Sequence, residues 1–161
     1  MPGNIITTGL VTPALSKVDN VARAKVGQVV NTDDGGQAIF VQALSEISTF
    51  AAVAIFADST AQMLTTTIAA TSKKVGFAQT SIASGYYGWV QTSGTPKVNL
   101  AANCDDNVPL YTTATSGVLD DATVSGGLIL GLTSTVTISN ATAITCIAAL
   151  GCMVGTGATP A

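Results

Sequence analysis

The sequence predicts an all-β fold: a small antiparallel β-barrel or sandwich, or a related jelly roll, that follows an extended N-terminal arm. Short apolar segments alternate with turn-rich stretches along most of the 161 residues, which is typical of sandwiches and barrels. Threonine is frequent, and its branched side chain fits a half-buried pleated surface. Only 9% of the residues are charged, which argues against a disordered acidic chain and a charged coiled coil.

Residues 1–25 are expected to form the arm, because they contain several glycines and prolines and show no sustained apolar period. The large apolar side chains of the arm would be exposed unless they lay on a neighbouring subunit or on the body of the same chain. These candidate contact residues are Ile5, Ile6, Leu10, Val11 and Leu15. Residues 26–161 are then expected to form a single β-rich domain, since a chain of this length supports one core.

Within that domain, strands are expected where β-branched and apolar residues cluster between turn residues. The turns include Asp33–Gly36 and Ser93–Pro96, whose Asp, Gly and Pro residues suit tight reversals. The expected strands are Val26–Val30, Ala38–Ala43, Ala52–Phe56, Met63–Ile68, Lys74–Gln79, Tyr86–Thr92, Lys97–Leu100, Val108–Thr112, Leu128–Leu132, Thr135–Ser139 and Ile144–Leu150. The cleanest alternation lies in Thr135–Ser139, where Val136 and Ile138 should face inward.

One segment also allows a helix. Apolar residues recur at helical spacing from Ile39 to Ala54, and residues 44–47 would suit two helical turns. The β-branched and aromatic residues of 39–41 and 53–56 favour a strand, a loop and a second strand. We therefore expect two strands here.

Residues 75–94 read as one hairpin that concentrates aromatic side chains. Phe77 lies on its first arm, and Tyr86, Tyr87 and Trp89 lie on its second. Aromatic pairs across the two strands would fix their register. The same residues would also suit a ligand cage, but an isolated tryptophan is more often a core anchor, so a structural role is expected.

Three pairs of adjacent aspartates, at 33–34, 105–106 and 120–121, raise the question of calcium, which takes several oxygen ligands. None of the pairs has the spacing of a calcium-binding loop. Asp followed by Gly or Asn is common in ordinary turns, where the carboxylate bonds to the nearby backbone. Turns are the favoured interpretation, and no metal is expected.

Groups that would support catalysis are scarce. The chain has no histidine and a single glutamate, Glu46, so a serine or cysteine nucleophile would have no imidazole to activate it. Cys104, Cys146 and Cys152 form no Cys-x-x-Cys motif and are expected to be buried free thiols. The glycines form no phosphate-binding loop. The sequence therefore predicts a protein that is not an enzyme and has no cofactor or small-molecule substrate.

Charge and hydropathy limit the classes of partner that the chain is expected to bind. The net charge is −3 and the six basic residues are scattered, which disfavours nucleic-acid binding. The longest apolar run, residues 144–154, is shorter than the roughly 18 residues of a membrane span, so no membrane is expected. The N-terminal residues lack the pattern of a secretory leader, which suggests an origin in the cytoplasm. Low charge on an apolar, hydroxyl-rich chain favours self-association or docking to a larger body.

The hairpin and the segment after it resemble small capsid decoration proteins, also called cement proteins, of tailed bacteriophages. The resembling stretches are Val75–Gln79, Tyr87–Gln91, Ser93–Gly94, Val108–Thr113 and Gly117–Leu119. The resemblance covers about residues 36–135 and carries no active-site motif.

The resemblance implies a β-barrel or sandwich, a homotrimer, that binds the major capsid protein on the outer surface of the virion head and is assembled in the bacterial cytoplasm. It assigns no individual capsid-contacting residue. The apolar arm defined above offers a means of docking to the capsid or to a neighbouring subunit. The alternative is another structural protein of the virion, such as a minor shell, tail or spike component.

Overall fold

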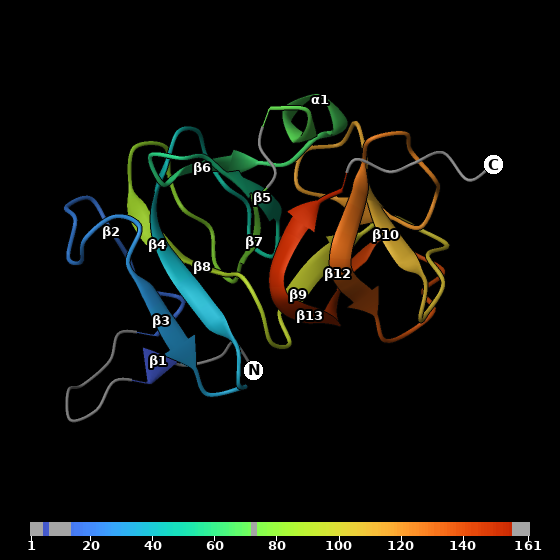
Figure 1. Ribbon diagram of the computed structural model, residues 1–161, viewed down its shortest axis with the longest axis horizontal. Helices are drawn as coiled ribbons and strands as arrows, with labels where there is room; N and C mark the ends of the chain where they lie inside the picture. Colours follow the sequence, from blue (N-terminus) through green and yellow to red (C-terminus); the bar gives the residue numbers. More distant parts are fainter. Residues whose placement is uncertain (1–4, 7–13, 72–73, 156–161) are drawn as a thin grey trace.

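The computed structural model describes residues 5–6, 14–71 and 74–155, and in these residues it contains a thirteen-stranded sheet and one short helix (Figure 1). The predicted all-β class is confirmed. The elements are β1 (Ile5–Ile6), β2 (Val18–Asp19), β3 (Val29–Thr32), β4 (Gln37–Ala43), β5 (Ala52–Ile55), β6 (Thr60–Met63), α1 (Thr66–Ala69), β7 (Lys74–Ala78), β8 (Tyr87–Gln91), β9 (Lys97–Leu100), β10 (Pro109–Thr112), β11 (Leu119–Asp120), β12 (Leu128–Ser134) and β13 (Thr142–Val154).

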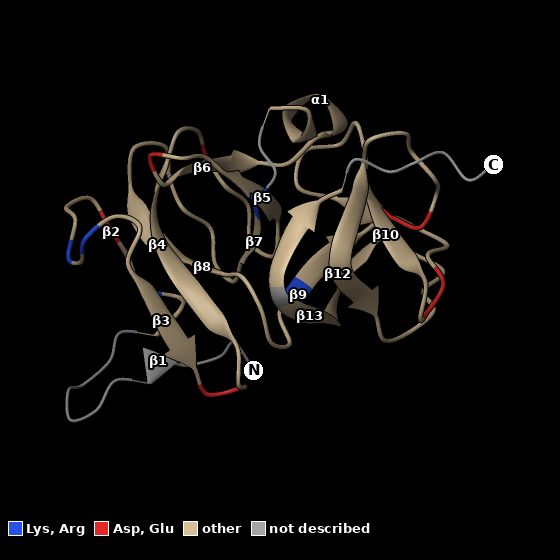
Figure 2. Ribbon diagram, in the orientation of Figure 1, with Lys and Arg blue, Asp and Glu red and all other residues tan. Residues whose placement is uncertain are grey.

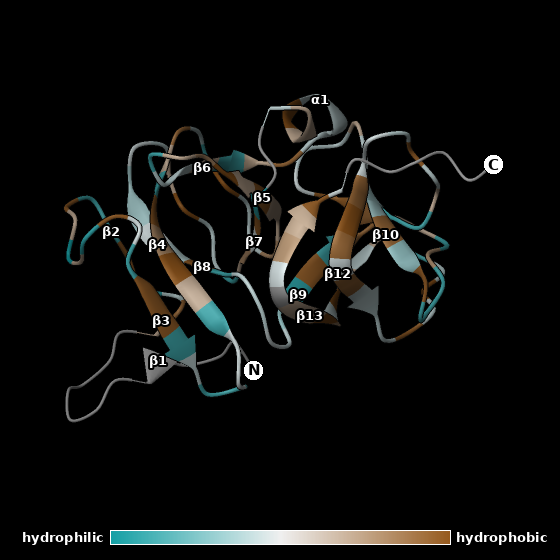
Figure 3. Cartoon of the chain, in the orientation of Figure 1, coloured by the Kyte–Doolittle hydropathy of each residue, from teal (hydrophilic) through white to brown (hydrophobic). Residues whose placement is uncertain are grey.

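The sheet closes on itself twice, so that the chain forms two five-stranded barrels side by side (Figure 1). The first barrel contains β4 to β8, and its interior holds Ile39, Val41, Val53 and Val90. The second contains β9 to β13, and its interior holds apolar residues of every strand: Val98, Leu100, Leu110, Leu119, Leu132 and Cys146. Apolar bands follow the strands of both barrels (Figure 3).

Both barrels have the same pattern of strand pairing. In each, the first strand pairs in parallel with the third, and the second pairs antiparallel with the third and the fourth. The fifth strand pairs antiparallel with the fourth and with the first, which closes the barrel. The barrels are therefore mixed, whereas the sequence predicted antiparallel strands throughout.

The long strand β13 joins the two barrels. Its first residues pair with β9 and complete the second barrel, and near its end Met153 pairs with Lys74 of β7 in the first barrel. The outer face of β5 and β7 belongs to the same apolar cluster as the interior of the second barrel. Because this face is buried between the barrels, the two are packed together as one body.

The second half of the predicted arm is part of the β-body. Strand β2 pairs with β8, and Leu15 is fully buried in a third cluster with Phe40 and Trp89. Strand β1 pairs with β3 through its backbone. The chain thus joins the body by residue 15, ten residues before the predicted boundary at residue 25.

Two of the predicted strands are wrong. The segment 63–68 ends β6 and begins α1, because Thr65 caps the helix: its Oγ1 accepts a hydrogen bond from the Ile68 amide (3.2 Å). The segment 135–139 is a loop in which Val136 is 53% exposed, while Ile138 points inward as expected. The strand expected at Val26–Val30 begins later, at Val29.

The other strands lie close to their predicted places, and residues 39–54 form β4, a loop and β5 instead of a helix. Residues 75–94 form the expected hairpin, in which β7 and β8 are antiparallel.

Candidate interaction surface

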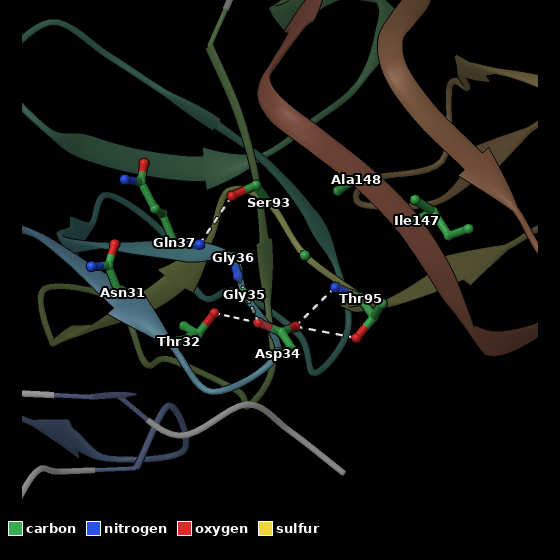
Figure 4. A pocket seen from close by; sticks show the side chains of 11 residues that line it. Asn31, Thr32, Asp34, Gly35, Gly36, Gln37, Ser93, Thr95, Ile147 and Ala148 are labelled. Carbon is green, nitrogen blue, oxygen red and sulfur yellow. Dashed lines mark hydrogen bonds between the residues drawn. The ribbon is translucent and has the colours of Figure 1, made fainter.

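A groove lies at the junction of the two barrels. Its first part is a hollow of about 690 Å³ between the β3–β4 turn, the residues that follow β8, and β13 (Figure 4). Asp34 and Thr95 lie on one side of this hollow, and Ile147 and Ala148 of β13 lie on the other.

The Asp34 carboxylate holds the segment that leads from the first barrel to the second. Its Oδ2 accepts hydrogen bonds from the Thr95 amide (2.8 Å) and hydroxyl (3.2 Å), and from Gln91 Nε2. Its Oδ1 accepts from the Gly36 amide (3.1 Å) and from the Thr32 hydroxyl. Next to Thr95, Gly94 exchanges two backbone hydrogen bonds of 2.9 Å with Ala148. Asp34 therefore fixes the turn, the connecting segment and β13 relative to one another.

These hydrogen bonds also determine the charge state of Asp34. Partial burial raises its pKa, but hydrogen bonds from Thr32, Thr95, Gln91 and Gly36 together outweigh burial, and the pKa lies below its ordinary value of 3.8. The ionised form is thus favoured in the folded protein. Its contribution to stability is complete above pH 3.8 and is lost as the pH falls through the lower pKa of the folded state.

Asp34→Asn should lower the free energy of unfolding by about 1–3 kcal/mol, because one amide cannot accept all the hydrogen bonds that the carboxylate accepts. Urea unfolding at neutral pH would measure this change. Asp105→Asn is the matched control, because Asp105 donates and accepts hydrogen bonds through its backbone amide and carbonyl, and its side chain is exposed. Equal stability of the Asp34 variant and the wild type would contradict the role given to this carboxylate.

The second part of the groove is mostly apolar. It is a hollow of about 430 Å³ that shares Gln37 with the first, and its lining includes Val29, Ile39 and Met153 together with one charged residue, Lys74. Val29, Ile147 and Met153 are respectively 49%, 57% and 46% exposed. Groups of exposed apolar side chains at a concave surface are typical of contact sites for other proteins. We call the two hollows together the junction groove.

Only some of the predicted arm contacts fall among the described residues. Ile5 and Ile6 form β1, and Leu10 and Val11 lie outside the described residues. Leu15 is fully buried inside its own chain, so it has no surface to offer to a partner. The groove residues Val29, Ile147 and Met153 were not predicted as contacts, and the alternation that exposes Ile147 and Met153 becomes visible only in the burial of β13.

The aromatic residues of the hairpin do not form one cluster. Trp89 lies opposite Phe40 of β4, with ring centroids 5.0 Å apart, and Tyr87 stacks on the same Phe40 ring. Phe77 instead faces the second barrel, and Tyr86 is 40% exposed. Phe77 lies opposite Gln91, so the expected aromatic pair across β7 and β8 is not formed. Trp89 is only 5% exposed, which agrees with a core role and leaves little surface for a ligand.

The other aspartate pairs serve turns. Asp58, which belongs to no such pair, also serves a turn, since it accepts from the Thr60 amide (3.0 Å) and hydroxyl (2.7 Å). Asp106 accepts from the Thr137 hydroxyl (3.0 Å), and Asp121 accepts from the Asp105 amide (2.9 Å). Cys104, Asp120 and Asp121 have ligand atoms within 4.8 Å of one another, a grouping explained by these turns.

The three cysteine thiols are free and buried, as expected. Burial is the main cause that raises the pKa of Cys104 and Cys152 to about 11 and that of Cys146 to about 12. The charges of Asp121 and Asp120 add to the effect at Cys104. Since the thiolate is the nucleophilic form, these side chains are unreactive at neutral pH.

Charged side chains are sparse on the β-body (Figure 2). Both ion pairs among the described residues involve Asp19, which lies 3.7 Å from Lys17 Nζ and from Arg23 Nε. In the described part of the chain, no helix is long and apolar enough to cross a membrane. The surface is thus mostly uncharged, and the groups that it offers to a partner are mainly apolar side chains and hydroxyls.

No protein-family model matches this chain, and no curated protein sequence matches it.

Proposed function

We propose that this chain is a non-enzymatic decoration protein of a phage head, which binds the outer surface as a homotrimer and stabilises the lattice of the major capsid protein. The junction groove supports this proposal most directly. A β-body with few charged residues presents Val29, Ile147 and Met153 to the outside at one place. These side chains would be covered when the protein lies on the capsid.

Binding through several weak contacts suits this task. A contact of about 800 Å² on each partner gives modest affinity by itself. When three linked subunits bind neighbouring capsid proteins, the second and third contacts form within one complex and the total affinity rises by about 10²–10⁴. To separate two capsid subunits, all of these contacts would then have to break together.

The groove can be tested with Ile147→Lys combined with Met153→Lys. Each change places a charge where an apolar contact is proposed, so binding should weaken at least about tenfold, which corresponds to about 1.4 kcal/mol. The measurement is cosedimentation with heads of the virus that encodes the chain, after the natural protein has been removed. Val136→Lys is the matched control, because Val136 is similarly exposed at 53% but lies on a loop outside the groove.

Wild-type binding by the double variant would contradict the role of the groove. Absence of wild-type binding to heads would contradict the proposed function itself. Cryo-electron microscopy of the complete particle adds a second test, since density in the tail or a spike would favour the alternative of another virion component.

Removal of residues 2–12 tests the proposed arm separately. The deletion removes the two-residue strand β1 at the edge of the sheet but keeps Leu15 and β2, so the rest of the β-body should still fold. Loss of Ile5, Ile6, Leu10 and Val11 should reduce binding to heads at least about tenfold. Circular dichroism provides the control for folding. Full binding by the folded deletion variant would show that the arm makes no essential contact.

A further inference from the structure

The two barrels match in strand order, and several of their strand pairs also match in register. The pairs Ala54–Gln62 and Ile55–Ala61 of the first barrel correspond to Tyr111–Asp120 and Thr112–Leu119 of the second. Likewise, Ala78–Val90 corresponds to Ser134–Cys146. Corresponding residues in these pairs are 56 to 58 positions apart in the sequence. Residues 37–91 and 95–147 are therefore two copies of one structural unit.

The connecting loops support the same correspondence. In the first barrel the Ile82 amide donates to the Ile47 carbonyl, and in the second the Ile138 amide donates to the Cys104 carbonyl, each at 2.9 Å. Positive φ angles also recur at matching positions. Phe50 (φ 60°) corresponds to Asn107 (φ 55°), and Ser59 (φ 62°) corresponds to Gly117 (φ 73°).

The first barrel packs on the second through the outer face of β5 and β7. The pairs Ala52–Phe77 and Ala54–Val75 form this face, and all four side chains are buried in the cluster that they share with the second barrel. The Ala52 amide also donates to the Gly117 carbonyl of the second barrel (3.0 Å). The contact is head-to-tail, because the second barrel takes part through different elements, among them the end of β13.

The corresponding face of the second barrel is uncovered. Pro109–Thr133 corresponds to Ala52–Phe77, and beyond a bulge in β12 Tyr111–Leu128 takes the place of Ala54–Val75. Pro109 is exposed, and Tyr111, Leu128 and Thr133 are half-buried. Leu130, in the bulge of β12, is 45% exposed on the same side. We call this surface the β10–β12 face.

We infer that the β10–β12 face docks onto a second copy of this chain. The corresponding β5–β7 face of the first barrel already packs against the second barrel within the chain. We therefore expect the β10–β12 face to pack against a barrel of the same fold. Neither β10 nor β12 carries a charged residue, and a Tyr and two Leu with flanking Pro and Thr are suited to a protein interface (Figure 2). A charged partner would find no complementary group on these strands.

In a head-to-tail contact the two copies use different surfaces, so an open row of copies always has an unpaired surface at each end. All surfaces are paired only when the copies close into a ring. Three copies would close a ring of six barrels. Self-association through this face specifies how the proposed homotrimer would form. That the oligomer belongs to a virion rests on the proposed function. The contact itself follows from the internal repeat.

The test is the mass of the full-length protein in solution, measured by size-exclusion chromatography with light scattering at tens of micromolar. The wild type should elute as an oligomer of the 16.1 kDa chain. Leu130→Lys combined with Thr133→Lys should elute as a monomer, with association weakened at least tenfold. Leu44→Lys is the matched control, because Leu44 is 52% exposed on the first barrel, and it should keep the wild-type mass.

A monomeric wild type, or a double variant with the wild-type mass, would overturn the inference. Leu130→Ser is a milder second variant for the case in which the double variant unfolds, and it should weaken association without lowering the melting temperature. Binding to heads is scored separately. If the wild type associates but does not bind heads, the proposed function is contradicted, while the inference that the β10–β12 face binds a second copy still stands.

Discussion

Phe77→Ala should lower the free energy of unfolding by about 3–5 kcal/mol, the range found for buried phenylalanines. Phe77 has no exposed surface and lies between the two barrels, in the cluster that contains the interior of the second. Its removal would leave a cavity that neither barrel can fill, since both are closed rings of strands. Chemical denaturation followed by circular dichroism would measure the change.

Tyr86→Ala is the control, because Tyr86 belongs to the same hairpin but is 40% exposed. It should change stability by less than about 1 kcal/mol. A loss below 1 kcal/mol in the Phe77 variant would show that the barrels do not depend on this contact. Two separate unfolding transitions in that variant would support the view that Phe77 couples them.

Leu15→Ala should cost about 2–5 kcal/mol, as expected for a leucine that is fully buried. Leu15 covers the outer face of the first barrel, where Phe40 and Trp89 lie. Trp89 is the only tryptophan of the chain, so its fluorescence reports on this place. Exposure of the indole in the variant should shift its emission to longer wavelength.

Val21→Ala provides the comparison for Leu15, since Val21 lies in the same segment and is 59% exposed. It should stay within about 0.5 kcal/mol of the wild type and keep the wild-type emission. If Leu15→Ala behaved like Val21→Ala, the segment 14–25 would not be a firm part of the β-body.

The sequence allowed the fold class and most strands to be predicted, because local patterns decide them. Residues 38–43 and 97–100 have the β-branched and apolar content of strands, and they are strands. Residues 63–68 have similar content, but the Thr65 cap favours a helical turn. Residues 135–139 alternate correctly, yet β12 stops pairing with β13 at Ser134 and the chain has to turn there.

The internal repeat was beyond the reach of sequence patterns. Val41 and Val98 correspond, but at most matched strand positions the residues differ in size and polarity, as Trp89 and Thr145 do. What the two units share is strand order and, outside the bulged β10–β12 pair, most of the hydrogen-bond register, which depends on backbone geometry and tolerates many side chains. The repeat therefore becomes visible only when the strands are paired.

The surfaces were difficult to predict for a related reason. Phe77 and Trp89 both project outward from the first barrel, but the curvature of the barrel directs them to different neighbours. Ile147 and Met153 lie in an apolar run that reads as buried, and they are exposed because alternate residues of β13 face outward. Only the three-dimensional arrangement separates core from contact residues in such runs.

The shared strand β13 has a mechanical consequence. A force that pulled the two barrels apart would act on one continuous chain segment, which is paired with β9 near its start, with β12 at both ends, and with β7 through Met153 near its end. Tension along β13 would load many of these hydrogen bonds in shear at the same moment. The chain would resist stretching as a single unit, and a load applied to one barrel would be carried directly to the other.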